Sequence, residues 1–155
     1  MSRQDYGTPS EFFAAVAGRF GAPSCDLAAC PENAACSRHF SERDDSLAQD
    51  WTGLSGVLWL NPPFRTIDPW AAKCSESAGP GRTILMLTPA SIGTNWFRDH
   101  VLGRALVLGL NPRLTFVGET APYPKDLMLS VWDGYGTSGF GQWEWAPRGA
   151  RRAAA

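Results

Sequence analysis

The sequence predicts an α/β fold in which a single, mainly parallel sheet is flanked by helices. Two apolar runs, Val57–Leu60 and residues 84–87, are continuous enough for strands that are covered on both faces. Segments with helical spacing of apolar residues alternate with these runs along the chain. Both runs stop at prolines, in Asn61-Pro62-Pro63 and in Thr88-Pro89, because proline cannot donate to a sheet.

One domain is expected from the length of 155 residues, of which 44% are hydrophobic. We place it at residues 1–147. We expect residues 148–155, which hold three arginines without apolar periodicity, to form a mobile tail. No apolar run approaches the roughly 18 residues that cross a bilayer, and no charged leader precedes an apolar stretch at the N-terminus. These features predict a cytoplasmic protein without a membrane partner.

The first third of the chain predicts a helix, a strand and a second helix. The first helix should begin near Thr8-Pro9, because aromatic and aliphatic side chains recur at helical spacing over residues 12–20. The partly apolar segment that ends at Asp26 is typical of the end of a buried strand. Pro31 then opens residues 33–40, for which we expect a second helix.

The later elements alternate in the same way. Val57–Leu60 is the expected central strand, and residues 66–77 suit a helix that Asp68 caps and in which Pro69 is the first residue. The other expected elements are a strand at 82–90, a helix at 94–102, a strand at 104–110, and three alternating strands at one sheet edge, 113–119, 126–134 and 140–146.

Charge is distributed unevenly along the chain, although the net charge is only -1. The first 50 residues carry eight acidic and four basic side chains, whereas the remainder carries seven acidic and ten basic ones. A polyanion should therefore meet the second half of the chain, because local phosphate contacts decide such binding rather than the total charge.

The cysteines raise the alternative of a metal site. Cys25, Cys30, Cys36 and His39 are close enough in sequence to suggest zinc, but they lack the two-residue C-x-x-C spacing of most structural zinc sites. Small buried thiols are the favoured interpretation, so we expect no metal. Stable disulfides are not expected in a chain without an export signal.

The segment Asn61-Pro62-Pro63-Phe64 carries the chemistry that the residues themselves predict. A strand that ends there delivers these residues to the carboxyl edge of the sheet, where open α/β sheets bind their ligands. The Asn61 carboxamide oxygen and the Pro62 carbonyl are two acceptors, and Phe64 adds an apolar ring beside them. Together they can hold a planar group that bears an NH2, such as an adenine turned out of a double helix.

Further motifs, in order, carry a resemblance to a known family. They extend over about residues 6–132 and comprise Tyr6-Gly7-Thr8-Pro9, Glu11-Phe12-Phe13, Cys25-Asp26-Leu27-Ala28-Ala29, Glu32-Asn33-Ala34 with Cys36, Asp45-Ser46-Leu47 before Trp51, Trp59-Leu60-Asn61-Pro62-Pro63-Phe64, Leu87-Thr88-Pro89-Ala90 with Trp96-Phe97, and Arg113-Leu114 with Phe116. In these residues the chain resembles the phage-type DNA N6-adenine methyltransferases. The resemblance implies a compact Rossmann-like methyltransferase fold, S-adenosylmethionine as cofactor, double-stranded DNA as substrate, and an origin in a phage or prophage, hence the host cytoplasm.

The resemblance also implies roles for individual residues. Within Asn61-Pro62-Pro63-Phe64, the Asn61 side chain and the Pro62 carbonyl would bind the adenine amine, and Phe64 would stack on the flipped base. Thr8 and Pro9 would lie near the methionine end of the cofactor. The full set implied for the cofactor is Tyr6, Thr8, Pro9, Asp26, Ala28 and Asp45. Unlike many methyltransferases, the chain has no Gly-x-Gly loop after its first strand.

Each assignment has a structural alternative. Asn61 can cap a turn, Phe64 can belong to the core, Asp26 can cap the helix that follows it, Asp45 can be solvated surface, and Thr8-Pro9 can simply start a helix. Alternative functions are methylation of an RNA base or a protein glutamine amide, or DNA binding without catalysis.

The length of 155 residues leaves little room for a separate recognition domain. We therefore predict a short recognition sequence in the DNA, contacted by loops at 91–100 and 133–141. The oligomeric state stays open.

Overall fold

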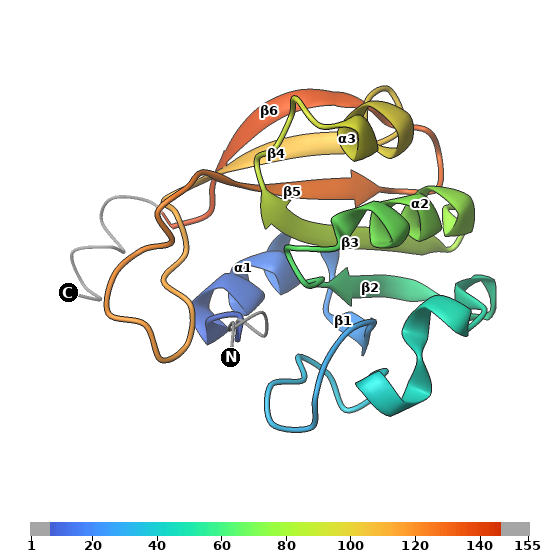
Figure 1. Cartoon of the computed structure of the whole chain (residues 1–155), viewed down its shortest axis with the longest axis horizontal. Helices are drawn as coiled ribbons and strands as arrows, with labels where there is room; N and C mark the ends of the chain where they lie inside the picture. Colours follow the sequence, from blue (N-terminus) through green and yellow to red (C-terminus); the bar gives the residue numbers. More distant parts are fainter. Residues whose placement is uncertain (1–6, 147–155) are drawn as a thin grey trace.

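A six-stranded sheet forms the centre of the computed structural model, which describes residues 7–146 (Figure 1). Its strand order is β1-β2-β3-β5-β4-β6. Five strands run in one direction, and β5 is antiparallel to both of its neighbours. The strands are β1 (Pro23–Asp26), β2 (Gly56–Leu60), β3 (Arg82–Pro89), β4 (Leu106–Asn111), β5 (Leu127–Trp132) and β6 (Gly139–Glu144). The predicted α/β class, with a single and mainly parallel sheet, is confirmed.

Helices cover both faces of this sheet. The helix α1 (Ser10–Phe20) packs on one face, and α2 (Ile67–Ser77) and α3 (Asn95–His100) pack side by side on the other (Figure 1). Successive residues of β3 point to opposite faces, so Leu85 contacts the cluster under α1 while Met86 contacts the cluster under α2. The continuous apolar runs of the sequence therefore reflect strands with two buried faces, as predicted.

The start of α1 is positioned by aromatic packing on β2. Pro9 is the N-cap of α1, so the predicted start at Thr8-Pro9 is confirmed to within two residues. The rings of Phe12 and Phe13 meet the Trp59 ring edge-on, with centroid separations of 6.0 Å and 4.9 Å. Because Trp59 lies two residues before Asn61, this packing brings the residues ahead of α1 to the end of β2.

Three short 3-10 helices connect β1 to β2 and lean on α2. They are η1 (Glu42–Asp44), η2 (Ser46–Ala48) and η3 (Trp51–Gly53). The fully buried Trp51 stacks on Trp70 of α2 at 6.3 Å, and its indole nitrogen donates to the Ser46 carbonyl at 3.1 Å. The Lys73 ammonium lies 5.2 Å from the Trp51 ring and donates to the Leu47 carbonyl at 2.9 Å. These contacts hold η2 and η3 against α2.

The helix predicted at 33–40 is wrong, because this segment consists of turns, bends and one β-bridge. Side chains take up the backbone donors that a helix would need. The Asn33 side chain accepts from the Cys30 amide at 2.8 Å, and the Asp26 carboxylate accepts from the Ala35 amide at 2.9 Å. Phe40 then donates its amide to the Asp26 carbonyl at 2.9 Å, so the segment ends extended alongside β1.

The strand predicted at 113–119 is also wrong, since residues 112–126 form a long loop. Leu114 and Phe116 are buried because the loop folds onto the cluster under α1, and this burial produced the alternating pattern. The predicted strand at 126–134 exists as β5, but it lies between β3 and β4 rather than at an edge. The strand expected at 140–146 does lie at the edge, as β6.

Smaller differences concern the ends of the elements. Thr66 rather than Asp68 is the N-cap of α2, which makes Pro69 its third residue. The other helices and strands match their predicted ranges to within a few residues.

Among residues 7–146, no helix has the length and apolar character that crossing a membrane requires. Residues 148–155 lie outside the described range, so the tail stays a prediction.

Candidate active site

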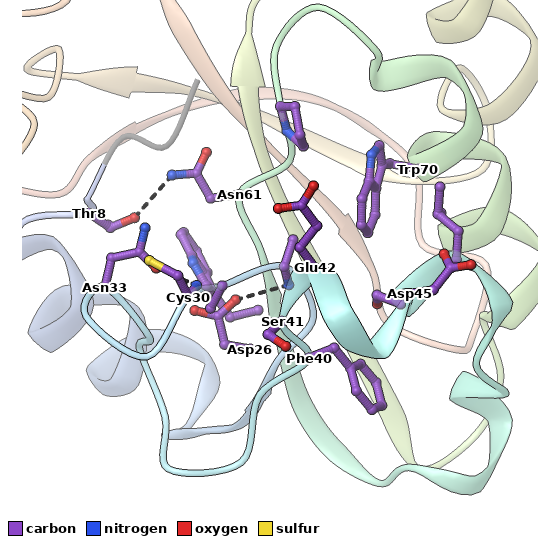
Figure 2. A pocket seen from close by; sticks show the side chains of 16 residues that line it. Thr8, Asp26, Cys30, Asn33, Phe40, Ser41, Glu42, Asp45, Asn61 and Trp70 are labelled. Atoms are coloured by element: carbon purple, nitrogen blue, oxygen red, sulfur yellow. Dashed lines mark hydrogen bonds between the residues drawn. The ribbon is translucent and has the colours of Figure 1, made fainter. Parts of the chain in front are cut away.

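A pocket of about 390 Å³ opens at the carboxyl ends of β1 and β2 (Figure 2). Thr8 and Asn61 lie on one side of it, and Trp70 and Asp45 on the other. The predicted site residues that it brings together are Thr8, Asp26, Ala28, Asp45, Asn61 and Pro63. A cavity at this edge is where an open α/β sheet binds a ligand.

Three predicted site residues do not line the pocket. Pro9 serves as the N-cap of α1, Pro62 is buried, and Phe64 is half-buried beside the pocket rather than in its wall. Tyr6 lies outside the described residues.

Phe64 is held by two aromatic residues of the 112–126 loop. Its ring meets those of Phe116 and Tyr123 edge-on, with centroid separations of 6.4 Å and 5.7 Å. Phe116 and Tyr123 also contact each other, at 5.8 Å. Phe64 is partly buried and packs against both hydrophobic clusters as well, and its stacking role stays a prediction.

Asn61 contacts a residue near the N-terminus of the chain. Its side-chain nitrogen donates to the Thr8 hydroxyl oxygen at 3.4 Å, across 53 positions of sequence (Figure 2). Asn61 follows β2 directly, because the two prolines after it end the strand. Thr8 reaches it because Pro9 starts α1 at this point.

The Asp26 carboxylate is almost fully buried, with 3% of the residue exposed. It accepts hydrogen bonds from the Ala35 amide at 2.9 Å and from the Ala28 amide at 3.2 Å. Burial raises the pKa of this carboxyl from 3.8 to about 6, while the two amide hydrogen bonds lower it. Asp26 therefore fastens the segment that forms the floor of the pocket and is ionised at neutral pH. The capping alternative is wrong in its detail, because the described residues directly after Asp26 form no helix for it to cap.

This raised pKa predicts a pH dependence of stability. Between pH 4 and 6 the folded protein binds the Asp26 proton more tightly than the unfolded chain does, so the free energy of unfolding should fall as pH rises, by up to ~3 kcal/mol. Urea unfolding at pH 4, 5, 6 and 7 measures this slope. Asp26→Asn cannot ionise, and it should lose this part of the slope. Parallel pH curves for the two proteins would contradict the prediction.

The opposite wall consists of residues that sequence reasoning largely missed. Trp70 lies in the first turns of α2, Leu47 lies in η2, and Phe40 and Glu42 flank the start of η1. Among the described residues, Asp45 is the one non-glycine residue with a positive φ, 48°. This left-handed turn separates η1 from η2 and sets Asp45 at the rim. The signal that could have pointed to Trp70 is its place one turn into the helix after Asn61-Pro62-Pro63-Phe64.

The cysteines show a different arrangement from a zinc site. Cys25 is buried in the core, and the Cys36 thiol donates to the Pro23 carbonyl at 3.4 Å. Burial raises the pKa of both thiols, which disfavours the thiolates that bind zinc. Within residues 7–146 no three His, Cys, Asp or Glu side chains converge in a way that could hold a metal ion.

Comparison with known proteins decides the family. The family described as DNA N-6-adenine-methyltransferase (Dam) matches residues 1–126. This chain belongs to the Dam family. A curated relative in Escherichia phage T1, named DNA N-6-adenine-methyltransferase, is 33% identical over 113 residues, which are 73% of this chain and 47% of that protein.

Two further similarities accompany the Dam family match. The putative methyltransferase YfdM of Escherichia coli K12 is 33% identical over 67 residues, 41% of this chain and 69% of that one. A solved structure of a predicted O-methyltransferase from Agrobacterium tumefaciens is similar with a TM-score of 0.41 and 16% identity, over 83% of this chain and 71% of that one. This chain spans about half the length of its phage T1 relative.

Proposed function

We propose that this member of the Dam family transfers a methyl group from S-adenosylmethionine to the N6 amine of an adenine in double-stranded DNA. The observation that carries the proposal is the position of Asn61 at the end of β2, where its side chain enters a pocket large enough for a nucleoside cofactor. Membership of the Dam family supports the same substrate and reaction.

The lining of the pocket fits the parts of S-adenosylmethionine. Trp70, Phe40 and Leu47 supply apolar and aromatic surface for a purine ring. Asp45 and Glu42, both exposed at the rim, can accept hydrogen bonds from ribose hydroxyls or from an ammonium group. When bound, the cofactor supplies a methyl group on a positively charged sulfur.

The residues after β2 suit the other half of the reaction. The Asn61 side-chain oxygen and the Pro62 carbonyl accept the two N6 hydrogens, which favours a nitrogen whose lone pair can attack the methyl carbon in line with the departing sulfur. One N–C bond forms as the C–S bond breaks, and N6 gains positive charge until a proton leaves. Phe64, fixed by Phe116 and Tyr123, offers an apolar surface to the flipped base.

The charge of the rim indicates from which side DNA approaches. Glu42, Asp44 and Asp45 outnumber the one basic residue of η1, Arg43, so this side of the pocket carries a net negative charge and repels phosphate. The loops after β3 and β4 lie at the same sheet edge and are tied together by the Ala90 amide, which donates to the Asp126 carbonyl at 2.9 Å. We therefore place the DNA over these two loops.

Exposed aliphatic side chains support this placement. Ile92 follows β3 with 60% of its surface exposed, and Val117 lies in the 112–126 loop with 67% exposed. The Val117 amide donates to the Gly7 carbonyl at 2.9 Å, which sets Val117 beside Thr8. Of the two loops expected to contact DNA, 91–100 lies at this edge. The loop 133–141 follows the antiparallel β5 and therefore lies at the opposite edge.

A methylation assay tests the proposal. Purified protein incubated with unmethylated duplex DNA and S-adenosylmethionine should produce N6-methyladenine, measured by mass spectrometry of the nucleosides, and none without the cofactor. The methylated sites should share fewer than about six defined base pairs, since we place the DNA over only the two loops after β3 and β4. Methylation of RNA or of a protein amide instead, or cofactor binding without any methylated product, would overturn the proposal.

A further inference from the structure

An exposed apolar side chain stands at the tip of a turn in the 112–126 loop, which lies beside the start of α1 (Figure 1). The turn runs from Phe116 to Glu119, and the Glu119 amide closes it by donating to the Phe116 carbonyl at 3.0 Å. Gly118, with a φ of 85°, supplies the positive φ that the third position of a type II turn requires. Val117 is therefore the apex residue, and 67% of its surface is exposed.

The turn is held in place on both sides of Val117. The Phe116 ring is buried and meets the Phe64 ring edge-on at 6.4 Å. The Val117 amide donates to the Gly7 carbonyl at 2.9 Å. A Cβ atom at Gly7 would lie only 3.1 Å from the Val117 Cβ, so glycine lets the turn come this close to the backbone directly before Thr8. The apex is therefore fixed beside the residues proposed to receive the adenine, and little of its freedom remains to be lost when DNA binds.

An adenine that leaves the stack of bases creates a space between the neighbouring base pairs. Proteins that open or kink a duplex offset such a cost with an apolar side chain inserted between the bases. That side chain must be apolar, rigidly held, next to the site of the flipped base, and narrow enough to enter. Val117 meets these requirements, because the other central residue of its turn, Gly118, has no side chain to widen the tip.

We propose that Val117 enters the duplex and fills the space that the flipped adenine leaves, an inference that rests on the proposed function. Val117 is then a positioning residue, because it touches the neighbouring bases and not the reacting atoms. It raises the fraction of complexes in which the adenine is turned out. Since only those complexes react, this fraction multiplies the rate of methylation.

A comparison of two duplexes tests this role. Both are built on one site that the wild-type protein methylates, with the target adenine opposite thymine in the first and opposite an abasic position in the second. An unpaired adenine turns out at a lower cost, so it depends less on the inserted side chain. The measured quantity is the ratio of single-turnover rates of N6-methyladenine formation, second duplex over first, at saturating S-adenosylmethionine.

Val117→Ala should raise this ratio by roughly tenfold over that of the wild type, because it removes two methyl groups that would be buried between bases. The loss should fall on the paired duplex, with the rate on the abasic duplex within about twofold of the wild type. Val117→Ile keeps an apolar tip and should retain the ratio of the wild type. Ile92→Ala is the matched control, since it removes an aliphatic side chain, 60% exposed, from the loop after β3 and should leave the ratio unchanged.

The inference is overturned if Val117→Ala lowers both rates equally or lowers neither, or if Ile92→Ala raises the ratio as much. Each ratio compares two substrates of one protein preparation, so any unfolded fraction of a variant affects both rates alike and cancels. The proposed function fails separately, through absence of N6-methyladenine from wild-type protein on both duplexes.

Discussion

Asn61→Ala should lower the rate of N6-methyladenine formation by about 10²–10³-fold in a single-turnover experiment. The substitution removes the acceptor that stabilises the charge developing on the adenine nitrogen, a loss felt mainly in the transition state. Binding of S-adenosylmethionine, measured by calorimetry, should change far less, because the residues that offer aromatic and acidic contacts, Trp70, Glu42 and Asp45, lie on the other side of the pocket.

Asn61→Asp is the matched variant for this prediction. Aspartate has the same shape and keeps an acceptor oxygen, but it cannot donate to Thr8 as the amide nitrogen does. It should retain more activity than the alanine variant. An Asn61→Ala protein that keeps more than a tenth of the wild-type rate on duplex DNA would contradict the role of Asn61 in the reaction.

Trp51→Ala should destabilise the protein by about 3–5 kcal/mol, because it removes a fully buried indole and leaves a cavity between η3 and α2. It also removes the ring beneath Lys73 and the hydrogen bond to the Ser46 carbonyl. Without the Trp51 indole, the part of the pocket wall formed by η2 is held less firmly in place. The affinity of the pocket for S-adenosylmethionine should therefore fall as well. Urea unfolding and calorimetry measure the two effects.

Two further variants bracket this result. Trp51→Phe keeps an aromatic ring against Trp70 and should lose less stability than the alanine variant. Tyr135→Ala removes a ring that is 80% exposed at the far edge of the sheet, and its free energy of unfolding should change by less than about 0.5 kcal/mol. A Trp51→Ala protein as stable as Tyr135→Ala would contradict the anchoring role.

The strand that delivers Asn61 could be predicted from sequence because its signals are local. The apolar run Val57–Leu60 indicates burial on both faces, and the two prolines fix where the strand stops. The helix α1 could be predicted for the same reason, since its buried residues Phe12 and Val16 recur at helical spacing.

The segment between β1 and β2 could not be predicted, because its conformation depends on side chains that replace backbone partners. Asp26 and Asn33 accept amide hydrogens that a helix would have used internally. The position of β5 between β3 and β4 could not be predicted from local sequence patterns either. Its burial on both faces is visible in the residues, but its pairing with β3 and β4 is decided across the whole sheet.

The same distinction between local patterns and long-range packing applies to the candidate site. Asn61 and Asp26 could be placed at strand ends, so their meeting in one pocket followed from the predicted sheet. The contact of Thr8 with Asn61 joins residues 53 positions apart, and no spacing rule reaches that far. The wall formed by Trp70 and Phe40 depends on how η1 and η2 pack, which the sequence pattern does not indicate.

The central position of β5 has a consequence for synthesis of the protein. Neither β3 nor β4 pairs with the other, and both are joined only through β5, near the end of the described chain. While residues 127–132 are still inside the ribosome, β1, β2 and β3 have no partner at the β3 edge. This nascent half-sheet has an unpaired edge along β3, and an unpaired edge favours aggregation with other partly synthesised chains.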